Sequence, residues 1–379
     1  MKVLITCLSH SWGGLEMYSI LTAKQLIKNN IETELLCYIN SSVYKEALKE
    51  DLPIITTNFK NYFQINSYLN VAKTLKEKKF DIIHCQASKD LWLMVPALKL
   101  AKLSTPLLLT KQMGSYIIKK DFLHKWIYKR VNGAFAISKV IAKNLVDTTP
   151  LTEEKIKLLH NSIDTEKFNP SVVDRNKVRN EYNIQENEIL IGMMARFSPG
   201  KGHEEFILAA NELSKKYNNL KFMIVGEPSK GEDNYAAEIK TLASSLSVID
   251  KIIFTGFRKD TPEILAALDI FVFPSHAEAF GIALAEALSM GVPSVCSNSD
   301  GVLDIAVDNV TSLLFEKKNW SDLKDKLEIL INNEGLRREF SIASRKRAVD
   351  LFDIKIFTNK LLGLYNYFLF MNQKNLSIN

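Results

Sequence analysis

Cysteine is scarce in this sequence, and no two cysteines form a motif. Cys7, Cys37, Cys85 and Cys296 are the only four, each lies in or beside an expected apolar strand, and no C-x-x-C is present. This spacing excludes a disulfide framework and a cysteine zinc knuckle, and it is typical of a reduced, cytosolic protein. The histidines lack H-x-x-x-H and H-E-x-x-H spacing as well, so no zinc site is expected.

Long hydrophobic runs and several well-known catalytic signatures are also missing. The nearest candidate for a membrane span, 91–109, is interrupted by Lys99, Lys102 and two prolines. Residues 1–8 carry one lysine and no small-residue cleavage site, which favours a strand over a signal peptide. The absence of G-x-S-x-G, Walker A and G-x-G-x-x-G patterns argues against an α/β-hydrolase and a P-loop NTPase and leaves a dinucleotide fingerprint unsupported.

The overall composition is that of a soluble globular protein. Hydrophobic residues make up 46% and charged residues 24% of the 379 residues, a length for which two domains are the natural expectation. The formal net charge of +6 fits an anionic ligand or an anionic membrane surface, and it equally fits a lysine-rich protein with neither partner. No nucleic-acid partner is expected.

Short β-branched runs alternate with longer amphipathic runs along the whole chain. Runs such as 189–191 and 270–273 are almost continuously apolar, which is typical of parallel strands covered on both faces. The pattern predicts an α/β protein with two doubly wound, Rossmann-like domains facing a central cleft. The expected strands are 2–8, 34–38, 81–84, 107–110, 133–138 and 157–160, then 189–195, 221–226, 251–255, 269–273 and 293–297.

We place the first domain at 1–170 and the second at 171–352. A final helix, within 353–379, is expected to pack back on the first domain. Ligands of such sheets bind at the carboxyl ends of the strands, so a ligand that bridges both domains would occupy the cleft between them.

Two glutamates, Glu278 and Glu286, lie where the expected strand 269–273 gives way to a helix. If the whole stretch were helical, they would be ~12 Å apart along the axis. That is too far for an acid/base pair acting on one glycosidic bond, but suitable for two hydroxyl-binding groups on one extended ligand. The plain alternatives are a carboxylate at a helix N-terminus and a partly exposed helix residue; together with Gly281 and a nearby basic pair, the functional interpretation is favoured.

The basic pair is Arg196 and Lys201, which follow the expected strand 189–195. Lys201 is expected in the first turn of the next helix, where the helix dipole already disfavours a cation. A bound diphosphate would neutralise both charges. The alternative is a solvated turn with spare charges.

Glycines stand at the ends of several other expected strands. Gly13 and Gly14 open the first helix, with Glu16 in its first turn, and Gly226 and the loop 256–258 end two later strands. Such glycines let the backbone approach a ligand, and the loop 256–258 could hold a base through its backbone. Taken singly, each also fits ordinary turn chemistry.

His84 ends an expected strand of the first domain and is expected to face the cleft. Contact with a ligand and a satisfied structural role fit this position equally well.

The segment 119–130 combines five basic residues with Phe, Leu, Trp, Ile and Tyr. On a helix it would form a basic amphipathic surface of the kind that binds anionic lipid headgroups. The alternative, a solvated helix with its aromatic face in the core, is retained.

With these residues assembled, the chain resembles the retaining GT-B glycosyltransferases of family 4. The elements that carry the resemblance are Gly13-Gly14-Leu15-Glu16, Asp81-Ile82-Ile83-His84, Asn161-Ser162-Ile163-Asp164, Arg196 with Lys201, and Glu278 through Glu286 followed by Gly291-Val292-Pro293. The glutamate pair in its strand–turn–helix setting is the specific element, and the others are supportive.

The resemblance implies transfer of a sugar from a UDP-, GDP- or ADP-sugar, with retention of anomeric configuration and without a metal cofactor. Arg196 and Lys201 would hold the diphosphate, Glu278 would touch the transferred sugar, and Glu286 would bind the ribose. The further donor-side residues are Gly13, Gly14, Gly226, Phe257, Arg258, Phe280, Gly281 and Ile282. The acceptor would bind chiefly to the first domain, where His84 and Glu16 are candidates.

The sequence departs from the family pattern at several positions. Many relatives have a histidine after the strand that here ends at Thr110, where this chain has Lys111 and Gln112, so either residue would face the reacting centre. The usual Gly-Gly after a later strand reads Ser299-Asp300-Gly301, a change that bears on donor selectivity.

The expected function is synthesis of a cell-surface glycan such as lipopolysaccharide. The acceptor would be a glycan or a lipid-linked sugar, and the enzyme would be cytoplasmic, on the inner face of the plasma membrane. The alternatives are a same-fold synthase or epimerase with a small soluble acceptor, and a non-catalytic subunit that binds sugar nucleotides.

Overall fold

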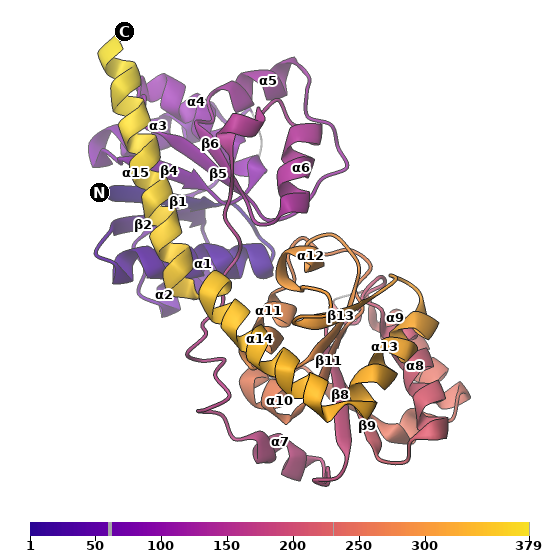
Figure 1. The fold of residues 1–379 in the computed structure, drawn as a ribbon. Helices are drawn as coiled ribbons and strands as arrows, with labels where there is room; N and C mark the ends of the chain where they lie inside the picture. Colours follow the sequence, from indigo (N-terminus) through magenta and orange to yellow (C-terminus); the bar gives the residue numbers. More distant parts are fainter. Residues whose placement is uncertain (60–62, 230, 379) are drawn as a thin grey trace. The chain divides into compact units, whose positions relative to one another are not determined.

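A computed structural model describes residues 1–59, 63–229 and 231–378. The chain forms two compact units, one made of residues 1–160 with the C-terminal residues from 357 onward, the other of residues 161–356 (Figure 1). Each unit is a parallel β-sheet with helices between successive strands. The predicted fold class, a pair of doubly wound Rossmann-like domains, is confirmed.

The first unit holds a seven-stranded sheet with the order β3-β2-β1-β4-β5-β6-β7. All of its pairings are parallel. The direction in which successive strands are added reverses between β1 and β4. The strands are β1 Lys2–Cys7, β2 Glu32–Tyr38, β3 Ile54–Thr57, β4 Ile82–Cys85, β5 Leu107–Lys111, β6 Gly133–Ala136 and β7 Ile156–Leu158. The helices are α1 Gly14–Lys28, α2 Ser42–Lys49, α3 Ile65–Lys78, α4 Leu91–Ala101, α5 Phe122–Lys129, α6 Lys139–Thr148 and most of α15 Ile354–Ile378.

The second unit holds a six-stranded parallel sheet with the order β10-β9-β8-β11-β12-β13, reversed between β8 and β11. The strands are β8 Ile189–Met194, β9 Leu220–Val225, β10 Ile252–Gly256, β11 Ile270–Phe273, β12 Ser294–Ser297 and β13 Ser312–Phe315. The helices are α7 Arg175–Glu181, α8 His203–Lys216, α9 Asp233–Ser245, α10 Thr261–Ala267, α11 Ile282–Ser289, α12 Val302–Ile305, α13 Trp320–Asn332 and α14 Glu334–Phe352.

Every strand expected from the sequence is present, and two further strands were missed. These are β3 and β13, each four residues long and each at an edge of its sheet. β3 is buried at only one of its four positions, so its sequence lacks the continuous apolar run that identifies the central strands.

Residues 161–170, which the sequence analysis assigned to the first domain, belong to the second unit. The amide of Ile163 donates to the carbonyl of Phe352 (2.8 Å), and Arg345 of α14 donates to the carbonyls of Thr165 and Phe168 (3.0 and 2.7 Å). This extended segment is therefore held against α14 by hydrogen bonds to main-chain carbonyls. Such bonds leave no hydrophobic pattern in the sequence, which is why the domain boundary was placed too late.

The C-terminal helix α15 packs on the first unit from residue 357 onward. Phe357 meets Tyr18 edge-on (5.4 Å between ring centres), and Tyr365 is completely buried. No helix in the described part of the chain is both long enough and apolar enough to cross a membrane.

Candidate active site

The predicted site residues of the second unit come from the loops that follow β8 and β11. These strands are neighbours, with Ile191 opposite Ile270, and the strand order reverses between them. In open parallel sheets ligands bind at the carboxyl ends of the strands beside such a reversal. The topology thus places Arg196, Lys201 and Glu278 at the expected ligand-binding edge.

The two loops are held together by backbone contacts that require glycine. The amide of His276 donates to the carbonyl of Gly200 (2.9 Å). Gly202 has φ +81°, and a Cβ there would lie 2.4 Å from the carbonyl oxygen of Pro274. The turn after β8 therefore packs directly on the start of the loop after β11, and this close approach leaves room only for glycine at position 202.

Lys201 forms an ion pair with Glu278, with 2.5 Å between Nζ and Oε1. Their side chains keep 24% and 17% of their exposure, so both remain accessible to a ligand. Lys201 precedes α8, which begins at His203, so the prediction that it lies in the first turn of a helix is wrong. Its positive charge is balanced by Glu278 rather than opposed by a helix dipole.

Arg196 is exposed, and its guanidinium donates to the hydroxyl of Ser229 (2.7 Å). It forms no ion pair with any residue that the structure describes. Its charge also helps to lower the pKa of Glu232, so Arg196 and Lys201, which share the loop after β8, each have a carboxylate nearby.

The loop from Glu278 to Gly281 leads into α11, whose N-cap is Gly281 at φ +109°. Glu278 lies in this loop, so the fully helical spacing of the two glutamates does not occur. The amide of Gly301 donates to the carbonyl of Glu278 (2.9 Å), and a Cβ at Gly301 would lie 2.5 Å from the carbonyl oxygen of Ala279. The glycine retained from the family's Gly-Gly pair therefore supports the loop that carries Glu278.

The side chain of Phe280 is 2% exposed and packs edge-on against Phe352 at 5.6 Å. Phe280 is therefore part of the core, and a donor-binding role for its backbone stays a prediction. The first amides of α11, from Ile282 onward, have no partner within the helix, and such amides attract anions.

Glu286 lies in the middle of α11 and is half-buried. It makes no hydrogen bond or ion pair with any residue that the structure describes. Burial raises the pKa of its carboxyl group from 4.5 to about 7, and Lys167 opposes this rise. A carboxylate with no protein partner has its acceptor capacity free for hydroxyl groups of a ligand.

A pocket of about 400 Å³ lies beside these loops, at the carboxyl ends of β8, β9 and β10. It brings together Arg196, Gly226, Phe257 and Arg258. Gly226 has φ +144°, and a Cβ there would lie 2.0 Å from the carbonyl oxygen of Ala195, so the floor of the pocket requires glycine. Phe257 is 61% exposed and offers an aromatic face at the rim.

The guanidinium of Arg258 is fully engaged within the protein. It pairs with both Glu181 (2.5 Å) and Asp260 (2.7 Å) and also donates to the hydroxyl of Tyr182. Hydrogen bonds to these two carboxylates raise the pKa of Arg258 above its ordinary value. The expected donor-binding role is therefore limited to the backbone of this loop, which the side chain fixes in place.

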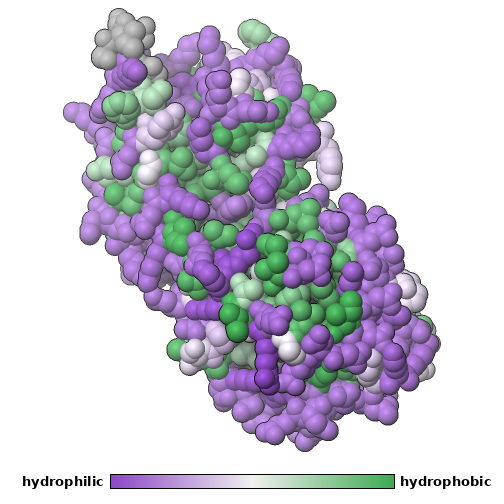
Figure 2. Space-filling view, in the orientation of Figure 1, coloured by the Kyte–Doolittle hydropathy of each residue, from purple (hydrophilic) through white to green (hydrophobic). Residues whose placement is uncertain are grey.

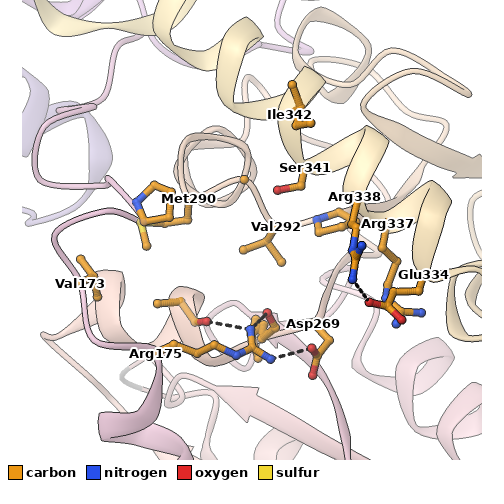
Figure 3. Close-up of a pocket in the computed structure, with 15 residues that line it drawn as sticks. Val173, Arg175, Asp269, Met290, Val292, Glu334, Arg337, Arg338, Ser341 and Ile342 are labelled. Carbon is orange, nitrogen blue, oxygen red and sulfur yellow. Dashed lines mark hydrogen bonds and ion pairs between the residues drawn. The ribbon is translucent and has the colours of Figure 1, made fainter. Parts of the chain in front are cut away.

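A second cavity of the same unit, about 590 Å³, lies at the opposite edge of the sheet, before β11 and β12 (Figure 3). Two ion pairs line it, Arg175 with Asp269 and Arg338 with Glu334, while Arg337 donates to the carbonyls of Leu330 and Ile331. Of the elements that carry the family resemblance, only Gly291-Val292-Pro293 lines this cavity, and none of the predicted site residues is among its described lining. In the part of the chain that the structure describes, no three His, Cys, Asp or Glu side chains are grouped to hold a metal ion.

In the first unit, Gly13 is the N-cap of α1, and Glu16 lies in its first turn and is largely buried. Gln112 follows β5 directly and is 6% exposed. Lys111, the last residue of β5, is half-buried, and burial together with the nearby charge of Lys119 lowers its pKa from 10.5 to about 8. These residues lie on the carboxyl side of their sheet, on a different unit from Glu278.

His84 is a structural residue, and its assignment to the acceptor side is wrong. Its side chain is 1% exposed, Nδ1 lies 2.6 Å from the hydroxyl of Tyr365, and Nε2 lies 2.6 Å from that of Thr110. Both ring nitrogens are thus satisfied within the core, between α15 and β5. The sequence left this outcome open because Tyr365 lies 281 residues away.

Two family models match the chain over adjacent ranges. Residues 12–167 match the model described as Glycosyltransferase Family 4, and residues 174–347 match Glycosyl transferases group 1. The chain belongs to the family 4 glycosyltransferases. Its GT-B fold and its enzyme class are thereby confirmed.

The glycosyltransferase is similar along nearly its whole length to two curated bacterial enzymes. It is 26% identical to N,N'-diacetylbacillosaminyl-diphospho-undecaprenol alpha-1,3-N-acetylgalactosaminyltransferase of Campylobacter jejuni, over 95% of this chain and 97% of that protein. It is 24% identical to UDP-Gal:alpha-D-GlcNAc-diphosphoundecaprenol alpha-1,3-galactosyltransferase of Escherichia coli, over 93% of each. A third relative, CapM of Staphylococcus aureus, a capsular polysaccharide biosynthesis glycosyltransferase, is 29% identical, but the match spans only 62% of this chain and 61% of that protein.

Among solved structures, a glycosyltransferase from Rickettsia africae has the same fold. The TM-score is 0.88 at 24% identity, with 97% of this chain and 98% of the other covered.

The structure also points to two candidate site residues of the glycosyltransferase that the sequence pattern did not identify. Gln86 follows β4, is 1% exposed, and has neither side-chain amide atom paired with any described residue. His276 lies 2.8 Å from Glu205 and so ties the Glu278 loop to α8. Side chains two positions apart along a strand point to the same face, so Gln86 points to the same side of the sheet as His84. The sequence pattern therefore identified the strand end but selected His84 rather than Gln86.

His84 gives the first unit a testable pH dependence. Burial lowers the pKa of His84 from 6.5 to about 3. Since the unfolded chain then binds a proton that the folded chain does not, the stability from His84 is complete above pH ~6.5 and falls by ~1.4 kcal/mol per pH unit below it. The free energy of unfolding, measured with urea at a series of pH values, should depend less steeply on pH in His84→Gln than in the wild type between pH ~6 and ~4, by the equivalent of one proton. Equal pH dependence in the variant and the wild type would contradict the assignment.

Proposed function

We propose that this glycosyltransferase retains anomeric configuration and moves a sugar from a UDP-sugar to a saccharide carried on a lipid diphosphate, in the synthesis of a cell-surface polysaccharide. The observation that carries the proposal is the Lys201–Glu278 pair, with Arg196 nearby, at the reversal between β8 and β11. UDP is favoured over GDP and ADP because one full-length relative is named for a UDP-linked donor.

On the donor side, two sources of positive potential would face the diphosphate. Arg196 and Lys201 supply formal charge, and the first amides of α11 supply a helix N-terminus. The base would occupy the pocket of about 400 Å³ against Phe257, and the ribose hydroxyls would reach Glu286.

In the reaction, the bond between the anomeric carbon and the diphosphate oxygen breaks while the acceptor oxygen attacks from the same face. The acceptor hydroxyl proton passes to the leaving phosphate oxygen. Arg196 and Lys201 would stabilise the charge that develops on this oxygen, and groups placed before the reaction are the most effective for this purpose. Glu278, held by Lys201, would orient the transferred sugar. No metal ion is part of the proposal, because these cations take that role.

On the acceptor side, Gln112, Gln86 and Glu16 of the first unit are the candidate contacts. The lipid-diphosphate acceptor is proposed because two full-length relatives are named for diphosphoundecaprenol-linked acceptors. Donor and acceptor of this kind would meet at the cytoplasmic face of the plasma membrane.

A donor panel tests the proposal. UDP-, GDP- and ADP-sugars would be screened by thermal shift, and each binder would be incubated with a polyprenyl-diphosphate-linked saccharide. The cognate donor at a hundredfold its Kd should stabilise the protein by ~2.7 kcal/mol. NMR of the product should show the same anomeric configuration as the donor. An inverted product would overturn the retaining assignment, and turnover only with a free sugar would overturn the lipid-linked acceptor.

A further inference from the structure

Six large apolar side chains are exposed together in the first unit, on the loop after β5 and on the start of α5. They are Met113, Tyr116, Ile117, Ile118, Phe122 and Leu123, which we call the apolar ridge, and each is at least 55% exposed. Figure 2 shows hydrophobic atoms at the surface near α5, among hydrophilic side chains. Clustered exposure of this kind marks an interaction surface, whereas single exposed residues do not.

The loop that carries the ridge is held in one conformation. Asn144 of α6 accepts from the amide of Ser115 and donates to its carbonyl, both at 2.9 Å. The amide of Lys119 donates to the carbonyl of Thr148 (2.7 Å), and Asp121 caps α5 through the amides of Leu123 and His124. The apolar side chains are therefore presented outward by a fixed backbone.

The charges around the ridge are almost all positive. The segment 111–130 contains six lysines and arginines and a single carboxylate, Asp121, which is occupied by the helix cap and by His124. Lys111, Lys119, Lys120, Lys125 and Lys129 form no ion pair with any described residue; only Arg130 is committed, to the carbonyls of Leu103 and Thr105 and the side chain of Asn132.

The buried face of α5 is separate from the ridge. Ile127 and Tyr128 lie in the core, while Trp126 is 37% exposed under the ammonium group of Lys99 (5.4 Å). Trp126, Lys99, Lys129 and Val95 line a groove of about 530 Å³ that contains none of the ridge residues among its described lining. The exposed apolar side chains thus lie in the loop before α5 and in its first turn, whereas the core contacts come from later residues of the helix, Ile127 and Tyr128.

We propose that the apolar ridge inserts into the surface of a bilayer that contains anionic lipid, with the surrounding lysines bound to lipid phosphates. Exposed aliphatic side chains flanked by lysines complement this partner, because the acyl boundary takes the former and the headgroups take the latter. A nucleic acid would leave Ile117, Ile118 and Leu123 without a partner.

The ridge would also place the acceptor. Its loop begins at Gln112, at the same sheet edge as the candidate acceptor contacts, so a lipid beside the ridge would present its diphosphate to that edge. Lys111 and Lys119, two half-buried lysines close enough for the charge of Lys119 to lower the pKa of Lys111, belong to the same segment. This step rests on the proposed function, whereas membrane binding itself does not.

Vesicle sedimentation without donor or acceptor tests the surface. The wild type should bind phosphatidylcholine vesicles that contain phosphatidylglycerol and should not bind phosphatidylcholine alone. Binding should weaken between about 0.1 M and about 1 M salt, as the Debye length falls from ~10 Å to ~3 Å. The double variants Ile117→Ser/Ile118→Ser and Lys120→Glu/Lys125→Glu should each bind at least ~10-fold less.

Ile342→Ser, at a position of the second unit that is 73% exposed, is the matched control and should bind like the wild type. Melting curves of all variants report whether each one folds. Equal binding by wild type and ridge variants, or no binding by the wild type, would overturn the proposal. Self-association that the ridge variants abolish, with vesicle binding unaffected, would identify a protein interface instead.

Turnover separates this inference from the proposed function. Ridge variants should keep wild-type rates on a short-chain, water-soluble acceptor and lose activity only on a vesicle-borne one. Loss on both acceptors would overturn the placement of the lipid-linked acceptor, while vesicle binding by an inactive protein would leave the ridge intact and refute the proposed activity.

Discussion

Replacing Lys201 by alanine is expected to lower kcat/KM for sugar transfer by ~10²–10³-fold, the usual effect of removing one preorganised group that stabilises developing charge. Lys201 is held 2.5 Å from Glu278 at the carboxyl edge of β8 and β11, beside the exposed Arg196. Its ammonium group would face the leaving diphosphate, so the loss should fall on kcat more than on KM. Single-turnover kinetics with the cognate donor would measure it.

An alternative role for this ion pair is purely structural, and a double-mutant cycle distinguishes the two roles. If Lys201 only holds Glu278, then Lys201→Ala should add little to the effect of Glu278→Gln. If each contacts a different part of the donor, the double variant should be less active than either single one. Lys215→Ala, which breaks an exposed ion pair with Glu212 in the same unit, is the matched control and should leave turnover unchanged.

The grouping of the candidate donor-binding loops was predictable because the sequence signals that identify them are local. Strand ends, a glycine and a charge within a few residues identify the loops after β8 and β11, and parallel topology then brings those loops together. Sequence spacing could not show that Lys201 precedes α8, because this depends on Gly202 at φ +81° against Pro274, 72 residues later. Nor could it show that Arg258 is engaged by Glu181 and Asp260.

The acceptor half was predicted less well because its decisive contacts are distant in sequence. His84 is enclosed by Thr110 and by Tyr365 of the last helix, and only the folded chain shows that no ring nitrogen remains for a ligand. Gln86 is the opposite case: a buried amide just after a strand end, with no hydrogen-bond partner among the residues that the structure describes. In the segment 111–130, periodicity suggested an amphipathic helix, whereas most of the exposed apolar side chains precede that helix, on a loop.

Replacing Glu286 by glutamine is expected to weaken binding of the UDP-sugar by roughly 10–100-fold, since hydrogen bonds to a carboxylate contribute ~1.5–3 kcal/mol. In the wild type, affinity should rise with pH through about 7, as the carboxyl group ionises and becomes the better acceptor. Isothermal titration calorimetry should use the intact nucleotide sugar, because a terminal phosphate titrates near pH ~6 and would mask the effect. Affinity of Glu286→Gln should not vary over this range.

The same substitution should make the protein more stable. The pKa of Glu286 is raised on folding, so the stability it contributes is complete below pH 4.5 and is lost as pH rises through about 7. The free energy of unfolding of Glu286→Gln should therefore exceed that of the wild type by ~1–2 kcal/mol at pH ~8 and by little at pH ~5. The difference at pH ~8 is kept this small because solvent screens a half-buried group. Glu334→Gln, on an exposed helix start, should show neither effect. If Glu286→Gln gained no stability and bound the donor normally, Glu286 would not be a donor-binding residue. Weaker binding together with higher stability is expected only of a carboxylate that is kept half-buried to bind a ligand.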